Sequence, residues 1–242
     1  MDLPSAIEHI RPSVFQICVQ VTGATFERYV LGTGFLVTED GLIVTAKHVA
    51  DVASEMLEGP GSRTLVASFA APNVDTPTLK MRANFSSVPL TLVSVDADND
   101  LGLLRLGVSP DSIPVMQIVD NPGEAARPRA AAISVDRPVE GELVAVSGYP
   151  LNEAALVTNA GSIASSWAVD EDNRNDRYLG DFTANPGNSG APVYRLSDGA
   201  VIGVCQGGKL TPVVGGAGKH AAFLTIIVPS QFVSSLVPSS GR

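Results

Sequence analysis

The stretch Asn185-Pro186-Gly187-Asn188-Ser189-Gly190-Ala191-Pro192 carries the strongest signal in the chain. Two glycines flank Ser189, so little side-chain bulk covers its hydroxyl. A glycine two residues before a serine permits backbone angles that other residues resist, and this geometry can direct the N–H groups of Gly187 and Ser189 to one point. The stretch predicts a nucleophilic serine with an oxyanion hole. Small-residue loops with serine are also common turns, so a base and an orienting acid are needed elsewhere.

The composition around this stretch favours an all-β fold. The chain has 242 residues, 45% of them hydrophobic, with 23 Gly and 17 Pro. Short segments rich in Val, Ile, Leu and Thr recur between Gly, Pro, Asn and Asp, and long amphipathic helical patterns are absent, which is typical of strands and turns. An all-β protein of this length often forms one domain.

Charge and motif spacing exclude several classes of function. The net charge of -9 and the pI of about 4.7 predict no nucleic-acid partner, because such a surface repels phosphates. No apolar run reaches the length of a membrane-spanning helix. The three histidines have no Cys or His partner at ligand spacing, so neither a metal nor a cofactor is expected. The glycines in 207–218 do not lead from a strand into a helix, which argues against a nucleotide-binding loop.

The cysteines and the N-terminus bear on the compartment. Cys18 and Cys205 lie in apolar, strand-like runs, and buried free thiols are the preferred interpretation, although a disulfide between them stays open. The segment Met1-Asp2-Leu3-Pro4 has neither a basic nor an apolar leader region, which predicts a cytoplasmic protein. A chain whose leader had been removed would look the same.

Apolar segments bounded by turn residues predict the order of the elements. A short helix is expected over 4–10 and another over 229–237. A first strand has Phe15, Ile17 and Val19 on one face. Glu39-Asp40-Gly41 is a hairpin turn. The expected strands are 14–21, 29–38, 42–45, 63–70, 78–85, 88–95, a run starting at Leu101, 142–147, 156–166, 191–195, 200–206 and 221–228. Residues 51–62 are expected to form a polar loop, and the charged run 170–177 a solvated one.

A candidate base and a candidate acid occur in the first half of the chain. His48 follows a strand and is expected in a one-turn helix, where it can point rigidly into a cleft. Asp100 lies between the acidic turn 96–99 and an apolar strand, where backbone N–H groups can hold a partly buried carboxylate. With Ser189, these residue types can form a nucleophile, a general base and an orienting acid. Asp98 is an alternative acid, two residues away.

With these residues in place, the chain resembles the trypsin-like serine peptidases of the chymotrypsin fold, and more closely their HtrA/Deg-like branch. The matching stretches are Gly32-Thr33-Gly34-Phe35, Thr45-Ala46-Lys47-His48-Val49, Asp100-Leu101-Gly102-Leu103-Leu104, Asn185-Pro186-Gly187-Asn188-Ser189-Gly190, Val201-Ile202-Gly203-Val204 and Ile227-Val228-Pro229-Ser230. The resemblance implies two six-stranded antiparallel β-barrels with the active site between them. Together with a linker indicated by the five prolines in 107–141, it predicts a single domain made of an N-terminal barrel, a linker, a C-terminal barrel and a terminal helix, over 11–108, 109–141, 142–228 and 229–238.

The resemblance also implies the roles of individual residues. It makes Ser189, His48 and Asp100 a catalytic triad, with the N–H groups of Gly187 and Ser189 as the oxyanion hole. It implies that the segment Cys205-Gln206-Gly207-Gly208 pairs with the substrate backbone. Thr183 falls at the floor of the pocket for the residue before the scissile bond, and Ala221 or Ala222 at its wall. Because that floor has no acidic residue, we expect small or medium apolar side chains there, not Lys or Arg.

Three departures from the family pattern stand out. Trypsin itself has an Asp before the serine, which pairs with a new N-terminal amine, whereas this chain has Asn188. Activation through that ion pair is therefore not expected. Ala191 replaces the second glycine of the usual Gly-Asn-Ser-Gly-Gly run. The PDZ domain that usually follows the HtrA protease domain is expected to be absent, since the chain ends at Arg242.

Together these features predict a serine endopeptidase that acts on protein or peptide substrates through an acyl-enzyme. The alternatives are a protease-fold binding module, a protease that needs an activating partner or oligomer, and an esterase on the same residues. An α/β-hydrolase is disfavoured by the residue order and by the missing second glycine of its motif. We also hypothesise that the loops 167–178 and 207–219 control the site, by leaving the oxyanion hole unformed until a ligand orders them.

Overall fold

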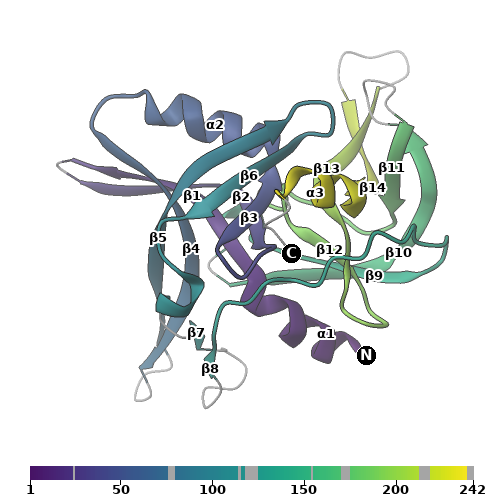
Figure 1. Cartoon of the computed structure of the whole chain (residues 1–242), viewed down its shortest axis with the longest axis horizontal. Coiled ribbons are helices and arrows are strands. Elements are labelled where there is room, and N and C mark those ends of the chain that lie inside the picture. Colours follow the sequence, from purple (N-terminus) through teal and green to yellow (C-terminus); the bar gives the residue numbers. More distant parts are fainter. Residues whose placement is uncertain are drawn as a thin grey trace.

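Two closed barrels, each of six antiparallel strands, make up the protein (Figure 1). The computed structural model describes residues 1–23, 25–75, 80–113, 116–117, 125–153, 155–169, 175–212 and 219–238. A short helix α1 (Leu3–Ile10) precedes the first barrel, and a helix α3 (Ser230–Leu236) follows the second. This arrangement confirms the predicted all-β fold with two six-stranded barrels and two terminal helices.

The first barrel has the strand order β1-β2-β3-β6-β5-β4. Its strands are β1 (Val14–Thr22), β2 (Phe26–Leu36), β3 (Leu42–Ala46), β4 (Ser62–Asp75), β5 (Lys80–Asp96) and β6 (Leu101–Leu106). Phe15, Ile17 and Val19 all enter the core of this barrel, as their alternation predicts. The turn between β2 and β3 contains Gly41 at a φ of +98°, a backbone angle that favours glycine.

The second barrel has the strand order β10-β11-β14-β13-β12-β9. Its strands are β9 (Leu143–Gly148), β10 (Val157–Val169), β11 (Asn175–Gly180), β12 (Pro192–Arg195), β13 (Val201–Pro212) and β14 (Lys219–Pro229). β11 is absent from the sequence prediction, which treats its first residues as part of a solvated charged loop. That prediction is wrong for Arg177, which is fully buried and donates hydrogen bonds to the main-chain oxygens of Asp176 and Asp98. Main-chain acceptors on both barrels let this charge enter a strand.

Two further expectations about the first barrel are wrong. The helix that begins beside His48, α2 (Lys47–Leu57), has 11 residues and includes most of the predicted polar loop. Its buried residues Val49, Ala50 and Ala53 pack along one face against the barrel, which explains its length. The segments 78–85 and 88–95 form the single strand β5. Here the hydroxyl of Ser87 accepts a hydrogen bond from Nε2 of Gln20 at 2.8 Å, so the polar residues near the predicted break stay within the sheet.

A shared apolar cluster joins the two barrels. It contains Phe35 and Leu103 of the first barrel, and Tyr194 and Val228 of the second. Both terminal helices contribute: Ile10 of α1 and Val233 of α3 are buried in the same cluster. The two terminal helices therefore pack where the barrels meet, and they help to fix how the two halves are oriented.

The segment between the barrels is also attached to both of them. It contains a 3-10 turn (Pro110–Ser112) and the two-stranded β7–β8 (Met116–Gln117 and Ala125–Ala126), and β7 lies next to β4 at the bottom of Figure 1. The N–H of Ala131 donates to Leu36 O at 2.8 Å, and that of Ser134 donates to Val201 O at 2.9 Å. The connecting segment is thus hydrogen-bonded to a strand of each barrel.

The two cysteines are buried free thiols, which confirms the preferred interpretation. Burial raises the pKa of the Cys18 thiol to about 11 and that of the Cys205 thiol to about 12. Because the thiolate is the reactive form, both groups are expected to be chemically inert in the folded protein. In the part of the chain that the structure describes, no helix is long and apolar enough to cross a membrane.

Candidate active site

His48 and Asp100 meet where α2 begins and β6 begins. Nδ1 of His48 lies 2.8 Å from Oδ2 of Asp100, and the main-chain N–H of His48 donates to Oδ1 at 3.0 Å. The N–H of Lys47 donates to the carbonyl of Asp100 at 2.9 Å. Both oxygens of the carboxylate and its own carbonyl are therefore bonded to the start of α2, which fixes the histidine relative to the acid.

The two side chains differ in solvent exposure, as a base and its orienting acid require. The side chain of His48 is 47% exposed, whereas that of Asp100 is only 14% exposed and lies behind it. A carboxylate accepts hydrogen bonds, so Nδ1 of His48 carries the proton and Nε2 is left as the basic nitrogen. Asp100 itself has a φ of +55°, a conformation that Asp and Asn tolerate better than most residues.

The loop that carries Ser189 packs directly against this corner. A Cβ atom placed on Gly190 would lie 2.8 Å from the N atom of Ala46, two residues before His48. A Cβ on Gly32 would lie 2.7 Å from the side chain of Val49 and 2.8 Å from the carbonyl of Ser189. The first barrel supplies the His48–Asp100 pair, and the serine loop of the second barrel packs against the residues on either side of His48.

Along the serine loop, N–H groups that donate to a main-chain carbonyl alternate with N–H groups that do not. The N–H of Asn188 donates to Asn185 O at 2.9 Å, and that of Gly190 donates to Cys205 O at 2.8 Å. The N–H groups of Gly187 and Ser189 have no acceptor among the described residues. Gly187 and Gly190 have φ values of +100° and +86°. Alternate free N–H groups in such a turn can bind an anion.

The hydroxyl of Ser189 donates to the main-chain oxygen of Gln206 at 3.1 Å. Gln206 is a bulged residue of β13, because Cys205 pairs with Ile227 of β14 and Gly207 pairs with Ile226. Cys205 is fully buried, its N–H donates to Ala191 O, and its carbonyl accepts from Gly190. Both main-chain groups of Cys205 are thus already used within the chain. The pairing of Cys205, Gln206, Gly207 and Gly208 with a substrate backbone stays a prediction, in which Cys205 has no main-chain group left to contribute.

The predicted pocket residues belong to the second half of the chain, with Thr183 just after β11 and the two alanines in β14. Thr183 is exposed, and its main-chain oxygen accepts a hydrogen bond from Asn159 at 2.9 Å. Ala221 and Ala222 belong to β14, but their side chains lie outside the described residues. Asn188 is buried, and its Oδ1 has no partner among the described residues. Parts of the loops 167–178 and 207–219 also lie outside the description, so the loop hypothesis stays a prediction.

Replacing Gly190 with alanine is expected to destabilise the protein by about 3 kcal/mol, because the change combines backbone strain with a clash. The new Cβ would lie 2.1 Å from the carbonyl of Thr33 and would require φ of +86°. Gly141→Ala is the matched control: its φ is +83°, but nothing lies within 4 Å of its Cβ position. It should cost only about 1 kcal/mol. Urea unfolding of both variants measures the difference, and equal losses would contradict the packing argument.

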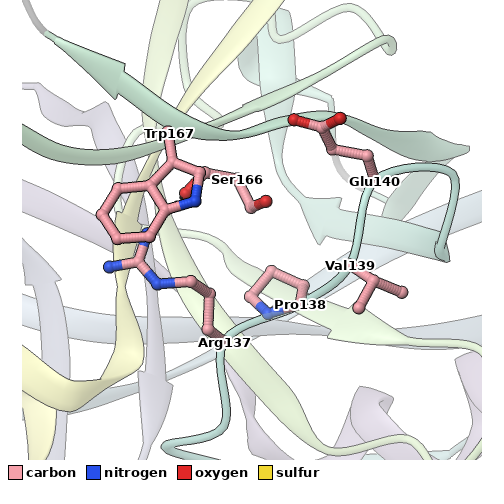
Figure 2. Close-up of a pocket in the computed structure, with 6 residues that line it drawn as sticks. All are labelled: Arg137, Pro138, Val139, Glu140, Ser166 and Trp167. Atoms are coloured by element: carbon pink, nitrogen blue, oxygen red, sulfur yellow. Dashed lines mark hydrogen bonds between the residues drawn. The ribbon is translucent and has the colours of Figure 1, made fainter.

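A cavity of about 470 Å³ lies apart from these residues, lined by Arg137, Pro138, Val139, Glu140, Ser166 and Trp167 (Figure 2). The guanidinium of Arg137 lies 3.6 Å from the centre of the Trp167 ring, and it donates to the main-chain oxygen of Ser166. None of the predicted site residues lines this cavity. Within the described residues, no group of three or more His, Cys, Asp or Glu side chains could hold a metal ion.

The sequence prediction assigned no role to two threonines that lie between the barrels. Thr33 and Thr45 are fully buried polar residues, and the hydroxyl of Thr45 donates to the carbonyl of Thr33 at 2.7 Å. Thr33 occurs in the stretch Gly32-Thr33-Gly34-Phe35, and its neighbours in the sequence do not indicate which polar groups it contacts. A hydroxyl in a predicted buried strand is the signal that could identify Thr33, because a buried polar group needs a hydrogen-bond partner.

Comparisons with known proteins agree with this geometry. A family model described as "Trypsin-like peptidase domain" matches residues 32–204. The chain is 30% identical over 182 residues to a "Probable periplasmic serine endoprotease DegP-like" from Halomonas elongata, covering 75% of this chain and 30% of that protein. It is 29% identical over 181 residues to "Serine protease HTRA2, mitochondrial" from Drosophila willistoni, covering 72% and 32% respectively. The chain therefore spans about a third of the length of these curated relatives.

Proposed function

Because this chain belongs to the trypsin-like peptidase family of serine proteases, we propose that it is an endopeptidase acting through Ser189, His48 and Asp100. The observation that carries the proposal is the 2.8 Å contact between Nδ1 of His48 and Oδ2 of Asp100, in the same corner as the serine loop. That contact leaves Nε2 of His48 as a base, which is the arrangement that peptide hydrolysis by a serine requires.

In the first half of the reaction, Oγ of Ser189 attacks the carbonyl carbon of the scissile peptide bond. Nε2 of His48 takes the hydroxyl proton, and Asp100 stabilises the resulting imidazolium through Nδ1. The N–H groups of Gly187 and Ser189 donate to the oxyanion that forms. The imidazolium then protonates the leaving amine as the C–N bond breaks, which leaves an acyl group on Ser189.

The second half repeats these steps with water as the nucleophile. His48 takes a proton from the water, the oxyanion forms again in the same hole, and the bond between the acyl group and Ser189 breaks. Protonation by His48 restores the hydroxyl of Ser189. Before the first step, the hydroxyl of Ser189 must break its 3.1 Å hydrogen bond to the carbonyl of Gln206. A substrate N–H that pairs with this carbonyl would compete with the hydroxyl and favour its rotation toward His48.

The substrates proposed are proteins or peptides with a small or medium apolar residue before the scissile bond. Thr183 supplies no negative charge at the expected pocket floor, so Lys and Arg would find no partner there. An activating partner or a homo-oligomer is also proposed, from the loops that border the site. A panel of peptides that differ only in this residue tests the specificity, and preferential cleavage after Lys or Arg would refute it.

Labelling with a fluorophosphonate probe tests the function, with tandem mass spectrometry to locate the modified residue. We expect the label on Ser189, cleavage of casein by the wild type, and the loss of both in Ser189→Ala. Ser235→Ala is the matched control, because Ser235 is exposed on α3 and its hydroxyl donates only to Gln231 O at 3.2 Å. Hydrolysis of activated esters without peptide cleavage would indicate an esterase, and no labelling would indicate a binding module. Either outcome would overturn the proposal.

A further inference from the structure

Thr33 of β2 connects the first barrel to the serine loop of the second through two hydrogen bonds. Its main-chain N–H donates to the carbonyl of Ser189 at 2.9 Å. Its hydroxyl donates to the carbonyl of Gly187 at 2.7 Å. The same hydroxyl accepts the N–H of Tyr149 at 3.0 Å, which orients its own proton toward Gly187. Thr33 thus holds the carbonyls of the two residues whose N–H groups form the proposed oxyanion hole.

The peptide groups on either side of Gly187 are held from both barrels. The carbonyl of Pro186 accepts the N–H of Leu151 at 2.8 Å. Because a trans peptide is planar, with its C=O and N–H on opposite sides, this bond directs the N–H of Gly187 away from Leu151. The following peptide is held by Thr33 at the Gly187 carbonyl and by Asn185 at the Asn188 N–H. Both backbone torsions of Gly187 are therefore fixed by bonds within the chain.

The peptide that ends at Ser189 is held in the same way. The carbonyl of Asn188 accepts the N–H of Ala191 at 2.9 Å, which directs the N–H of Ser189 to the opposite side. The carbonyl of Thr33 accepts the hydroxyl of Thr45, the residue three before His48. Through Thr33, one set of buried hydrogen bonds thus connects the strand before the base with the loop that carries the nucleophile.

From these contacts we propose that Thr33 is a positioning residue of the oxyanion hole. Its hydroxyl holds the peptide that follows Gly187, and the bond from Leu151 to the Pro186 carbonyl holds the peptide that precedes it. With both planes held, Gly187 keeps its φ of +100° and presents its N–H to the oxyanion without help from a ligand. The proposal rests on the proposed function, since it concerns the same site. For the oxyanion hole it is an alternative to the loop hypothesis, because the bonds that hold Gly187 come from β2 and from the turn at Leu151, outside the loops 167–178 and 207–219. An activating partner that orders those loops would then act on other parts of the site.

The test compares Thr33→Val, which keeps the shape but removes the hydroxyl, with Thr33→Ser, which keeps the hydroxyl. Loss of a single oxyanion-hole donor lowers kcat by about 10²–10³-fold, so Thr33→Val should lower kcat by about 10²-fold with KM nearly unchanged. Affinity for a peptide boronate, whose tetrahedral adduct occupies the hole, should fall by a similar factor. Thr33→Ser should stay within about threefold of the wild type in both measurements, because it keeps the hydroxyl that makes the hydrogen bond.

Thr158→Val is the control for a general loss of polar contacts. The hydroxyl of Thr158 lies 2.7 Å from that of Ser147 in the second barrel. This variant should lose stability without a change in kcat or in boronate affinity. Wild-type kinetics in Thr33→Val, or an equal kinetic loss in Thr158→Val and Thr33→Val, would overturn the proposal. Labelling of the wild type by a fluorophosphonate, required in advance, separates a failure of this proposal from a failure of the proposed function.

A measurement on the wild type keeps the proposal testable if Thr33→Val does not fold. On mixing with an activated-ester substrate in stopped-flow experiments, product should form without an initial lag, because a hole held by Thr33 needs no preceding rearrangement. A lag before product formation would show that the hole forms only after a conformational step, and this would overturn the proposal.

Discussion

His48→Ala and Ser189→Ala are each expected to lower kcat by about 10⁶-fold, and the double variant is expected to lose no more than either one alone. The reason is that the base and the nucleophile act in one step. Without Nε2 of His48 nothing removes the proton from Ser189, and without Ser189 that proton transfer has no purpose. The residual rate would come from the oxyanion hole and from substrate binding, which both variants keep.

Initial rates of cleavage of a fluorogenic peptide, with each variant purified away from wild-type enzyme, measure this effect. Substrate binding to Ser189→Ala, followed by calorimetry, serves as the control for intact folding. Losses that multiply in the double variant would show that the two residues act independently, and they would contradict the mechanism. A loss of less than about tenfold in His48→Ala would show that another group is the base.

Asp100→Asn is expected to lower kcat by about 10⁴-fold while leaving the fold intact. An asparagine Oδ1 can still accept the main-chain N–H of His48, and Asn tolerates the φ of +55° at this position. The amide Nδ2, however, is a donor and cannot accept a hydrogen bond from Nδ1–H. The ring then takes the other tautomer, with Nε2 protonated, and it can no longer act as the base.

Asp98→Asn is the matched control, because it makes the same change two residues away. Asp98 is exposed, and its main-chain carbonyl, which accepts a hydrogen bond from Arg177 at 3.5 Å, is untouched by the substitution. Its kcat should stay within about threefold of the wild type, since the carboxylate that contacts Nδ1 of His48 is that of Asp100. The variants are compared by kcat at saturating peptide and by thermal unfolding. The reverse order of effects would assign the orienting role to Asp98.

Much of the strand pattern was predictable because it depends on local alternation. The first strand, with Phe15, Ile17 and Val19 inward, needed no information from elsewhere in the chain. The errors occur where a distant contact decides the local structure. α2 extends to Leu57 because Val49, Ala50 and Ala53 find the first barrel to pack against. Arg177 can lie in β11, which pairs with β14, because its guanidinium donates a hydrogen bond to the carbonyl of Asp98 on the first barrel.

The candidate site divides in the same way. The sequence by itself determined which chemical groups are available: a serine between glycines, a histidine after a strand, and an aspartate before one. The likeness of the chain to the trypsin-like peptidases could also be identified without coordinates, because it depends on the residue types that the reaction requires and on their order in the sequence. Only the tertiary structure decided how they meet. The contact of His48 with Asp100 and the bond of Thr33 to Gly187 join residues far apart in the chain, and such contacts depend on the packing of two complete barrels.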